Sequence, residues 1–105
     1  MKTSQTKNEI RKQLFEKLSK IDGILSTTLV GSFVDKKGLD GISDIDTIVV
    51  CKKLSKEIYF KCISVLEKIN LEKCGLNGYK ILINSTFGPL KFDREKLVVI
   101  HLMIY

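Results

Sequence analysis

The feature that most constrains the fold is a pair of short β-forming segments joined through a Gly-Ser turn and a loop. The first segment ends at Gly31-Ser32, eleven residues follow, and the second segment opens with Asp44-Ile45-Asp46. Successive side chains of a strand point to opposite faces, so Asp44 and Asp46 are expected on one face and Ile45 on the other. Two neighbouring carboxylates repel each other, and a bound cation would neutralise them.

The aspartate pair indicates a metal–phosphate site rather than a polar strand end. Oxygen ligands alone favour a hard cation such as Mg²⁺ or Mn²⁺. The alternative is a pair of exposed strand-end aspartates, but strands disfavour aspartate, and this pair opens an otherwise apolar strand. We therefore predict a metal bound by Asp44 and Asp46, with the Gly31-Ser32 turn facing phosphates.

The remaining segments predict one mixed α/β domain over residues 1–105. Helical spacing of apolar residues and capping signals predict helices over residues 6–21 and 55–73, capped by Thr6 and Ser55. Alternation and turn residues predict strands over 24–30, 44–51, 79–87 and 97–105. The second and the last of these are apolar on both faces, which indicates central strands. Residues 33–43 are expected to form a loop.

Charge, cysteines and apolar runs bound the functional classes. The net charge of +6 suits a polyanionic partner such as RNA, DNA or nucleotide phosphates. The apolar runs are too short to span a membrane, and the first residues lack the apolar core of a signal peptide, so we expect a cytoplasmic protein. The cysteines have no metal-site spacing, and we predict reduced core thiols at Cys51, Cys62 and Cys74.

The sequence resembles the polymerase-beta-like nucleotidyltransferase superfamily. The resemblance lies in Val30-Gly31-Ser32, the spacer of this length, and the segment from Ser43 through Asp44-Ile45-Asp46 to Val49. The predicted helices before the first strand and after the second fall where that fold places them, so the similarity covers about residues 9–69. It implies a small mixed β-sheet flanked by helices.

The resemblance also implies an activity: transfer of a nucleoside monophosphate from an NTP such as ATP to an acceptor, with release of pyrophosphate. In that scheme Asp44 and Asp46 hold divalent ions, Mg²⁺ or Mn²⁺, that bridge the phosphates and help deprotonate the attacking hydroxyl. Gly31 lets the backbone approach a phosphate, and Ser32 offers its hydroxyl and backbone N–H to phosphate oxygens.

The acceptor stays open among a protein side chain, an RNA end and a small hydroxylated molecule. The chain has no room for a separate acceptor-binding domain, so a partner chain or a homodimer is expected to supply that surface. Small stand-alone members resemble toxin–antitoxin components.

Active members of the superfamily use a third carboxylate, flanked by apolar residues on a later strand. Residues 79–87 and 98–105 contain no acid, and His101, the only histidine, lies where such a residue is expected. His101 could replace the acid as base or as a softer metal ligand, or it could be a structural residue. Asp93 could swing in from the turn before the last strand.

An incomplete site stays open as an alternative. The chain would then be a catalytically degenerate nucleotidyltransferase-fold module that binds nucleotide or RNA. It could also be a fragment of a longer transferase that carries the third acid elsewhere.

Overall fold

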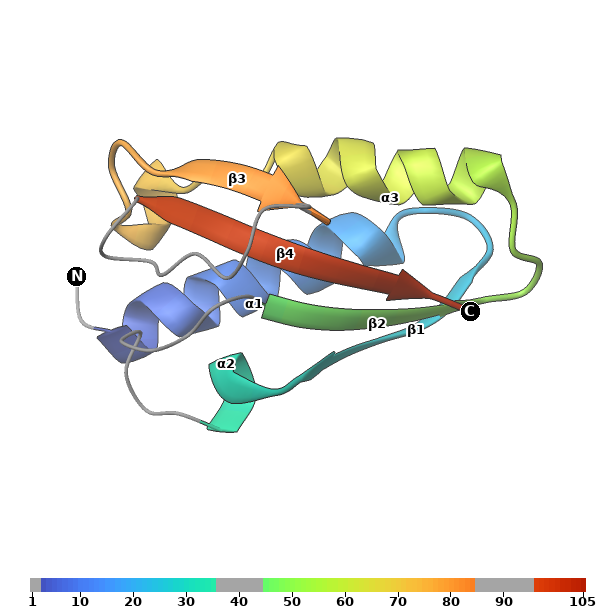
Figure 1. Ribbon diagram of the computed structural model, residues 1–105, viewed down its shortest axis with the longest axis horizontal. Coiled ribbons are helices and arrows are strands. Elements are labelled where there is room, and N and C mark those ends of the chain that lie inside the picture. The colour runs from blue at the N-terminus through green and yellow to red at the C-terminus, as the bar shows by residue number, and fades with distance from the viewer. Residues whose placement is uncertain (1–2, 36–44, 85–95) are drawn as a thin grey trace.

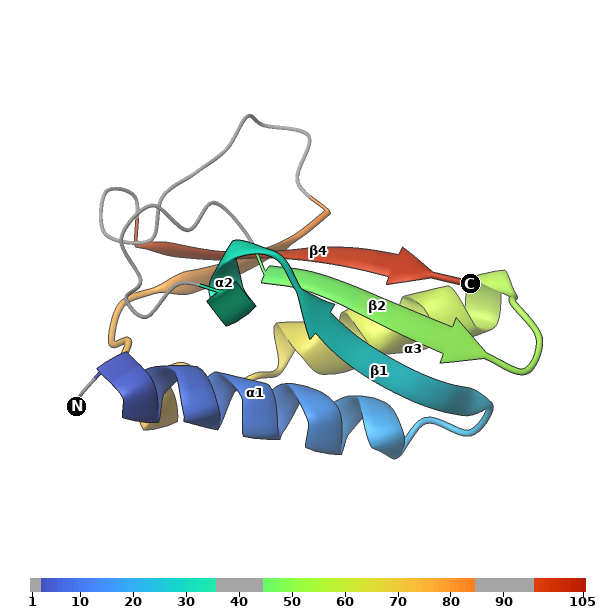
Figure 2. The same cartoon turned by 90° about the horizontal axis from the view of Figure 1, so that it is seen from below.

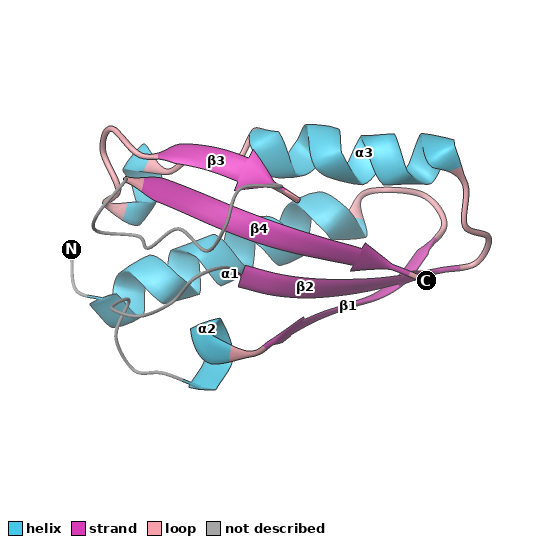
Figure 3. Cartoon of the chain, viewed as in Figure 1, coloured by secondary structure: helices cyan, strands magenta, loops and turns pink. Residues whose placement is uncertain are grey.

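The computed structural model describes residues 3–35, 45–84 and 96–105 (Figure 1). Within these residues the strands form one sheet in the order β1-β2-β4-β3. The strands are β1 (Ile24–Val30), β2 (Ile45–Cys51), β3 (Lys80–Ile83) and β4 (Leu97–Ile104). The helices are α1 (Thr3–Ser19), the single turn α2 (Ser32–Asp35), α3 (Lys56–Glu67) and the 3-10 turn η1 (Glu72–Cys74) (Figure 3).

The sheet is mixed, and its two central strands are those that the sequence predicts. Strand β1 runs antiparallel to β2, whereas β2, β4 and β3 run parallel to one another. Helices α1 and α3 pack against one face of the sheet, the helix face (Figure 2). On β2, Ile45, Thr47 and Val49 are buried toward this face, while Asp46 points to the opposite, outer face. The predicted mixed α/β fold with flanking helices is confirmed.

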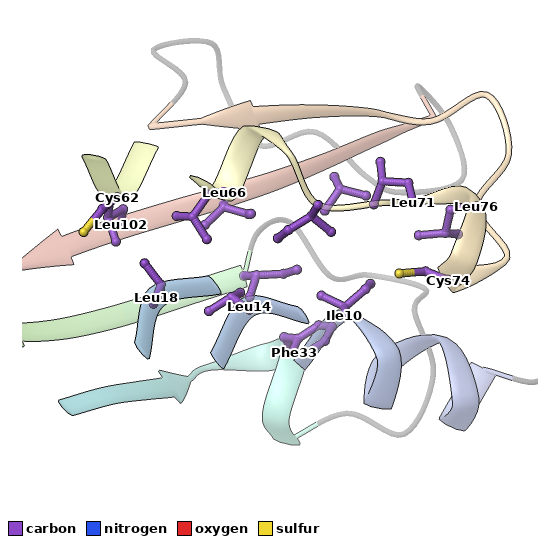
Figure 4. Packing of buried hydrophobic residues seen from close by; sticks show 14 of the residues in the cluster. Ile10, Leu14, Leu18, Phe33, Cys62, Leu66, Leu71, Cys74, Leu76 and Leu102 are labelled. Atoms are coloured by element: carbon purple, nitrogen blue, oxygen red, sulfur yellow. The ribbon is translucent and has the colours of Figure 1, made fainter. Parts of the chain in front are cut away.

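The core fills the space between the helix face and the helices. From α1 it takes Ile10, Leu14 and Leu18, all fully buried and spaced by four residues, as the helical pattern predicts (Figure 4). Burying one such side chain contributes roughly 1.5–3 kcal/mol. Phe33 of α2 is also fully buried in this cluster, so the short helix after β1 is anchored in the core.

Helix α1 starts at Thr3, so the prediction of Thr6 as its N-cap is wrong. The Thr6 hydroxyl donates instead to the carbonyl oxygen of Cys74 at 2.8 Å, a buried bond that ties α1 to η1. Gln13 adds two bonds to the backbone of Asn70, accepting from its N–H at 2.7 Å and donating to its carbonyl at 3.0 Å. The polar residues of this helix therefore serve tertiary contacts, and the helix ends at Ser19 rather than near residue 21.

Helix α3 begins where predicted but is shorter. The Ile58 N–H donates to the Ser55 hydroxyl at 3.2 Å, which confirms Ser55 as the N-cap. The helix ends at Glu67 rather than at residue 73. The chain after Glu67 leaves the helix and packs against α1. Its buried apolar residues do not follow helical spacing: Ile69, Leu71, Cys74 and Leu76.

Of the strand predicted over residues 79–87, the structure forms only β3, Lys80–Ile83. Asn84 leaves the strand with φ +52°, a left-handed conformation that asparagine tolerates. Residues 85–87 lie outside the described residues. The predicted loop over 33–43 is wrong at its start, where α2 forms and Phe33 is buried in the core. Residues 36–43 are not described.

The cysteines are free and buried, as predicted for core thiols. Burial, and then the charge of Glu9, raises the pKa of the Cys74 thiol to about 11. Burial also raises the pKa of the Cys62 thiol, with Cys51 as a second cause. Within the described ranges, none of the helices has the length and apolar character needed to cross a bilayer.

Candidate active site

The turn after β1 requires a glycine for two independent reasons. Gly31 has φ +82°, a conformation that side-chain-bearing residues rarely adopt. A Cβ atom at this position would also lie 2.6 Å from Oδ2 of Asp46, far inside van der Waals contact. The Gly31 carbonyl accepts from the Val34 N–H at 3.1 Å, which starts α2 at Ser32. The backbone of this turn therefore lies directly against the Asp46 carboxylate.

Asp46 lies between the two neighbouring strands. It pairs with Val30 of β1 on one side and with His101 of β4 on the other. The His101 Nδ1 atom is 3.4 Å from Asp46 Oδ1, and the two side chains are 51% and 27% exposed. Three segments far apart in the sequence thus bring Gly31, Asp46 and His101 together at the outer face of the sheet. The structural interpretation of His101, a residue held in place by a hydrogen bond, stays a prediction beside the catalytic one, and Asp46 is the partner that either role uses.

The contact gives the imidazole a defined chemistry. When Nδ1 carries the proton, it donates toward the Asp46 carboxylate and leaves the lone pair of Nε2 free to accept another proton. When Nδ1 is unprotonated, its lone pair and an Asp46 oxygen can ligate one cation together. The pair therefore offers either a base oriented by a carboxylate or a mixed oxygen–nitrogen ligand set. Both side chains are partly exposed, so their mutual attraction adds little to stability.

The described residues fit a divalent cation in part. They contain no group of three or more His, Cys, Asp or Glu side chains that could hold a metal. They do supply one carboxylate and one imidazole, and the Gly31 backbone lies against that carboxylate. Asp44 and Asp93 lie outside the described residues, so their predicted roles as ligands stay predictions.

The residues that follow Gly31 belong to α2, and contacts of Phe33 fix the position of this short helix. The backbone of Ser32 is described but its side chain is not, so its predicted bond to phosphate stays a prediction. The next residue, Phe33, packs under the ammonium group of Lys7, with Nζ 5.0 Å from the ring centroid. Burial, and then the charge of Arg11, lowers the pKa of Lys7. The burial of Lys7 could have been inferred from the sequence. Lys7 lies seven residues before Leu14, which places it on the same side of α1 as the buried apolar residues.

Comparison with known proteins agrees with this geometry. The model of a family described as "Nucleotidyltransferase domain" matches residues 11–101, a span that includes Gly31, Asp46 and His101. A search of curated proteins and a search of solved structures gave no match. The matched span covers most of the chain, and the mixed sheet with its two flanking helices is consistent with a fold of the nucleotidyltransferase type. The chain therefore belongs to the nucleotidyltransferase domain family.

Proposed function

We propose that this chain is a single-domain, metal-dependent enzyme that moves a nucleoside monophosphate from an NTP to an acceptor hydroxyl. Membership of the nucleotidyltransferase domain family supports nucleotidyl transfer in general. The observation that carries the proposal is the position of Asp46, with its carboxylate against the Gly31 backbone on one side and His101 on the other.

Each residue of the site takes a separate task in this proposal. Asp46, with Asp44, holds Mg²⁺ or Mn²⁺, which when bound neutralises phosphate charge and lowers the pKa of the acceptor hydroxyl. Gly31 lets the triphosphate approach the backbone, and Ser32 binds a phosphate oxygen. Asp93, which lies outside the described residues, is the alternative to His101 for the third position.

We assign His101 the role of base for the acceptor hydroxyl. Its Nδ1 faces the Asp46 carboxylate at 3.4 Å, which favours the tautomer with a lone pair on Nε2. Its exposed half leaves the ring accessible to an acceptor at the outer face. General base catalysis contributes about 10²–10⁴-fold to rate, so His101→Gln is expected to slow transfer by about 100-fold or more.

The function test is incubation with α-labelled NTPs, Mg²⁺ or Mn²⁺, and a lysate that supplies protein and RNA acceptors. Asp46→Asn is compared with Asp22→Asn, which removes the same charge from an exposed turn outside the site. We expect label transfer by the wild type and by Asp22→Asn, and loss of transfer in Asp46→Asn. Transfer that survives in Asp46→Asn would contradict the proposal.

The role of His101 needs a second measurement. The Mn²⁺ concentration that gives half-maximal transfer is compared between the wild type and His101→Gln. A base changes the rate and leaves this concentration as it is, whereas a ligand raises it. A raised half-maximal concentration with an unchanged maximal rate would therefore reassign His101 from base to metal ligand.

A second candidate is a nucleotide- or RNA-binding module without turnover. The observation that favours it is that, in the described residues, the strand position beside Asp46 holds an imidazole in place of a carboxylate. Calorimetric NTP binding that requires Asp46, without label transfer to any acceptor, would support this candidate. Because small stand-alone members resemble toxin–antitoxin components, a cytoplasmic partner protein or a second copy of the chain belongs among the acceptors tested.

A further inference from the structure

A groove of about 430 Å³ lies away from the Asp46 site, between the start of α3 and the end of β4. We call it the β4 groove. Its lining is mostly apolar and consists of Leu54, Ser55, Lys56, Tyr59, Phe60 and Ile104. Leu54 and Phe60 are 57% and 63% exposed, and both line this one groove, so their apolar surfaces form a shared patch. Core packing alone does not explain them.

Beside this groove the sheet ladder stops early. Strand β3 reaches only to Ile83, which pairs with Ile100, while β4 continues past the end of β3 to Ile104 (Figure 1). Asn84 leaves the strand, and its side chain takes a hydrogen bond that a longer β3 would have made with β4. Its Oδ1 accepts from the Leu102 N–H at 2.7 Å, and its Nδ2 donates to the Tyr59 hydroxyl at 2.9 Å. Among the described strands, none pairs with β4 beyond this point on the groove side.

On the groove side of β4, beyond the last pairing among the described strands, backbone hydrogen-bonding groups face the groove. The Tyr105 N–H donates to the Val49 carbonyl, so odd-numbered residues at this end bond to β2. The Leu102 N–H bonds to Asn84, so even-numbered residues face the other side. The carbonyl of Leu102 and both backbone groups of Ile104 therefore point toward the groove, where a further strand could pair with them.

The mouth of the groove is positively charged. Exposed Lys52 and Lys53 directly precede Leu54, and Lys56 belongs to the lining. The acid at the start of α3, Glu57, is engaged by Lys61 at 3.2 Å and offsets little of this charge. An acidic segment is the partner that complements such a surface.

We propose that the β4 groove binds an extended segment of a partner protein that alternates apolar and acidic residues and adds to β4 as a strand. Main-chain bonds to Leu102 and Ile104 give the pairing. Alternate side chains of an added strand face opposite sides, so the apolar ones enter the groove beside Phe60, while the acidic ones stay outside it, at the mouth formed by Lys52 and Lys53. The proposal does not depend on the nucleotidyltransferase reaction, because the groove shares no residue with the Asp46 site.

The test uses a fluorescein-labelled peptide, acetyl-Asp-Val-Glu-Val-Glu-Val-Asp-amide, titrated with the full chain and followed by fluorescence anisotropy. Leu54→Ala and Phe60→Ala are compared with Leu25→Ala, which truncates a leucine of 59% exposure on β1, outside the groove lining. We expect about tenfold weaker binding for each groove variant and unchanged binding for Leu25→Ala. Asp46→Asn should bind the peptide like the wild type.

Two further peptides separate the contributions of charge and backbone. Replacing the acids by lysine, or N-methylating alternate amides, should each abolish binding. Absence of binding by the acidic peptide, equal binding by the lysine peptide, or equal loss in Leu25→Ala and Phe60→Ala would overturn the proposal. A dimer of the chain in sedimentation that Phe60→Ala dissociates would also overturn it, because the groove would then belong to a second copy.

Discussion

Two consecutive residues of β2, Asp46 and Thr47, point to opposite faces of the sheet and have very different surroundings. Thr47 points to the helix face and is fully buried, whereas Asp46 points to the outer face, partly exposed between Gly31 and His101. The helix face is apolar nearly throughout and holds the fold together. The outer face tolerates a carboxylate because Asp46 is partly exposed to water and contacts the His101 imidazole. Alternation within one strand thus separates stability from chemistry, and substitutions on the two faces should have separable effects.

The largest expected effect tests the outer face and compares two glycines. Gly31 and Gly78 both have φ +82°, but only at Gly31 would a Cβ meet another group, Oδ2 of Asp46 at 2.6 Å. Alanine at either position should lower the free energy of unfolding by about 1–2 kcal/mol, because both adopt a left-handed conformation. Only Gly31→Ala should also reduce nucleotidyl transfer, by about 100-fold, since a misplacement of about 1 Å in a site costs that much.

Urea unfolding and label transfer measure the two effects of this glycine pair. Equal transfer by Gly31→Ala and Gly78→Ala would show that the carboxylate at Asp46 does not need its present position. A loss of transfer in both variants would trace the effect to general destabilisation.

The core between the helix face and the helices should respond to pH through the buried thiol of Cys74 in η1. Burial raises the pKa of Cys74 from 9.0 to about 11, so between these values the unfolded chain loses a proton that the folded chain keeps. The stability contribution is thus fully present below pH 9 and is lost as the pH rises to about 11. The loss is at most about 1.4 kcal/mol per pH unit.

Urea unfolding of the reduced protein at pH 8 and pH 10 tests this slope, with Cys74→Ala as the control. The difference in free energy between the two pH values should be smaller in the variant by the share of this thiol. Identical pH dependence of both proteins would show that Cys74 ionises equally well in the folded state.

The buried core, the cap of α3 and the central strands were the parts of the fold that the sequence predicted best. The spacing of Ile10, Leu14 and Leu18, the cap at Ser55 and the two central strands all follow from local patterns. The wrong predictions concern the N-cap of α1 and the length of β3, where contacts with residues distant in the sequence determine the structure. The hydroxyl of Thr6 donates to the carbonyl of Cys74. At the end of β3, the Asn84 side chain forms hydrogen bonds with the Tyr59 hydroxyl and the Leu102 N–H.

The candidate site was readable only in part. Gly31 and Asp46 stand in a recognisable pattern, and their mutual contact follows from two paired strands. The contact between Asp46 and His101 depends on the parallel register of β2 and β4, which places Ile45 opposite Ile100. No local pattern fixes a register between strands so far apart in sequence, so the sequence offered His101 as one option among several.

The smallest expected effect returns to Thr47, the polar residue of β2 on the helix face. Its hydroxyl is buried and has no hydrogen-bond partner among the described residues. An unsatisfied buried hydroxyl costs about 1–3 kcal/mol, so Thr47→Val, which keeps the shape, should stabilise the fold by about 1 kcal/mol and leave nucleotidyl transfer unchanged. Thr28→Val on exposed β1 is the control, with a change within about 0.5 kcal/mol. Thermal unfolding measures both, and a lower melting temperature for Thr47→Val would show that the hydroxyl binds a group beyond the described residues.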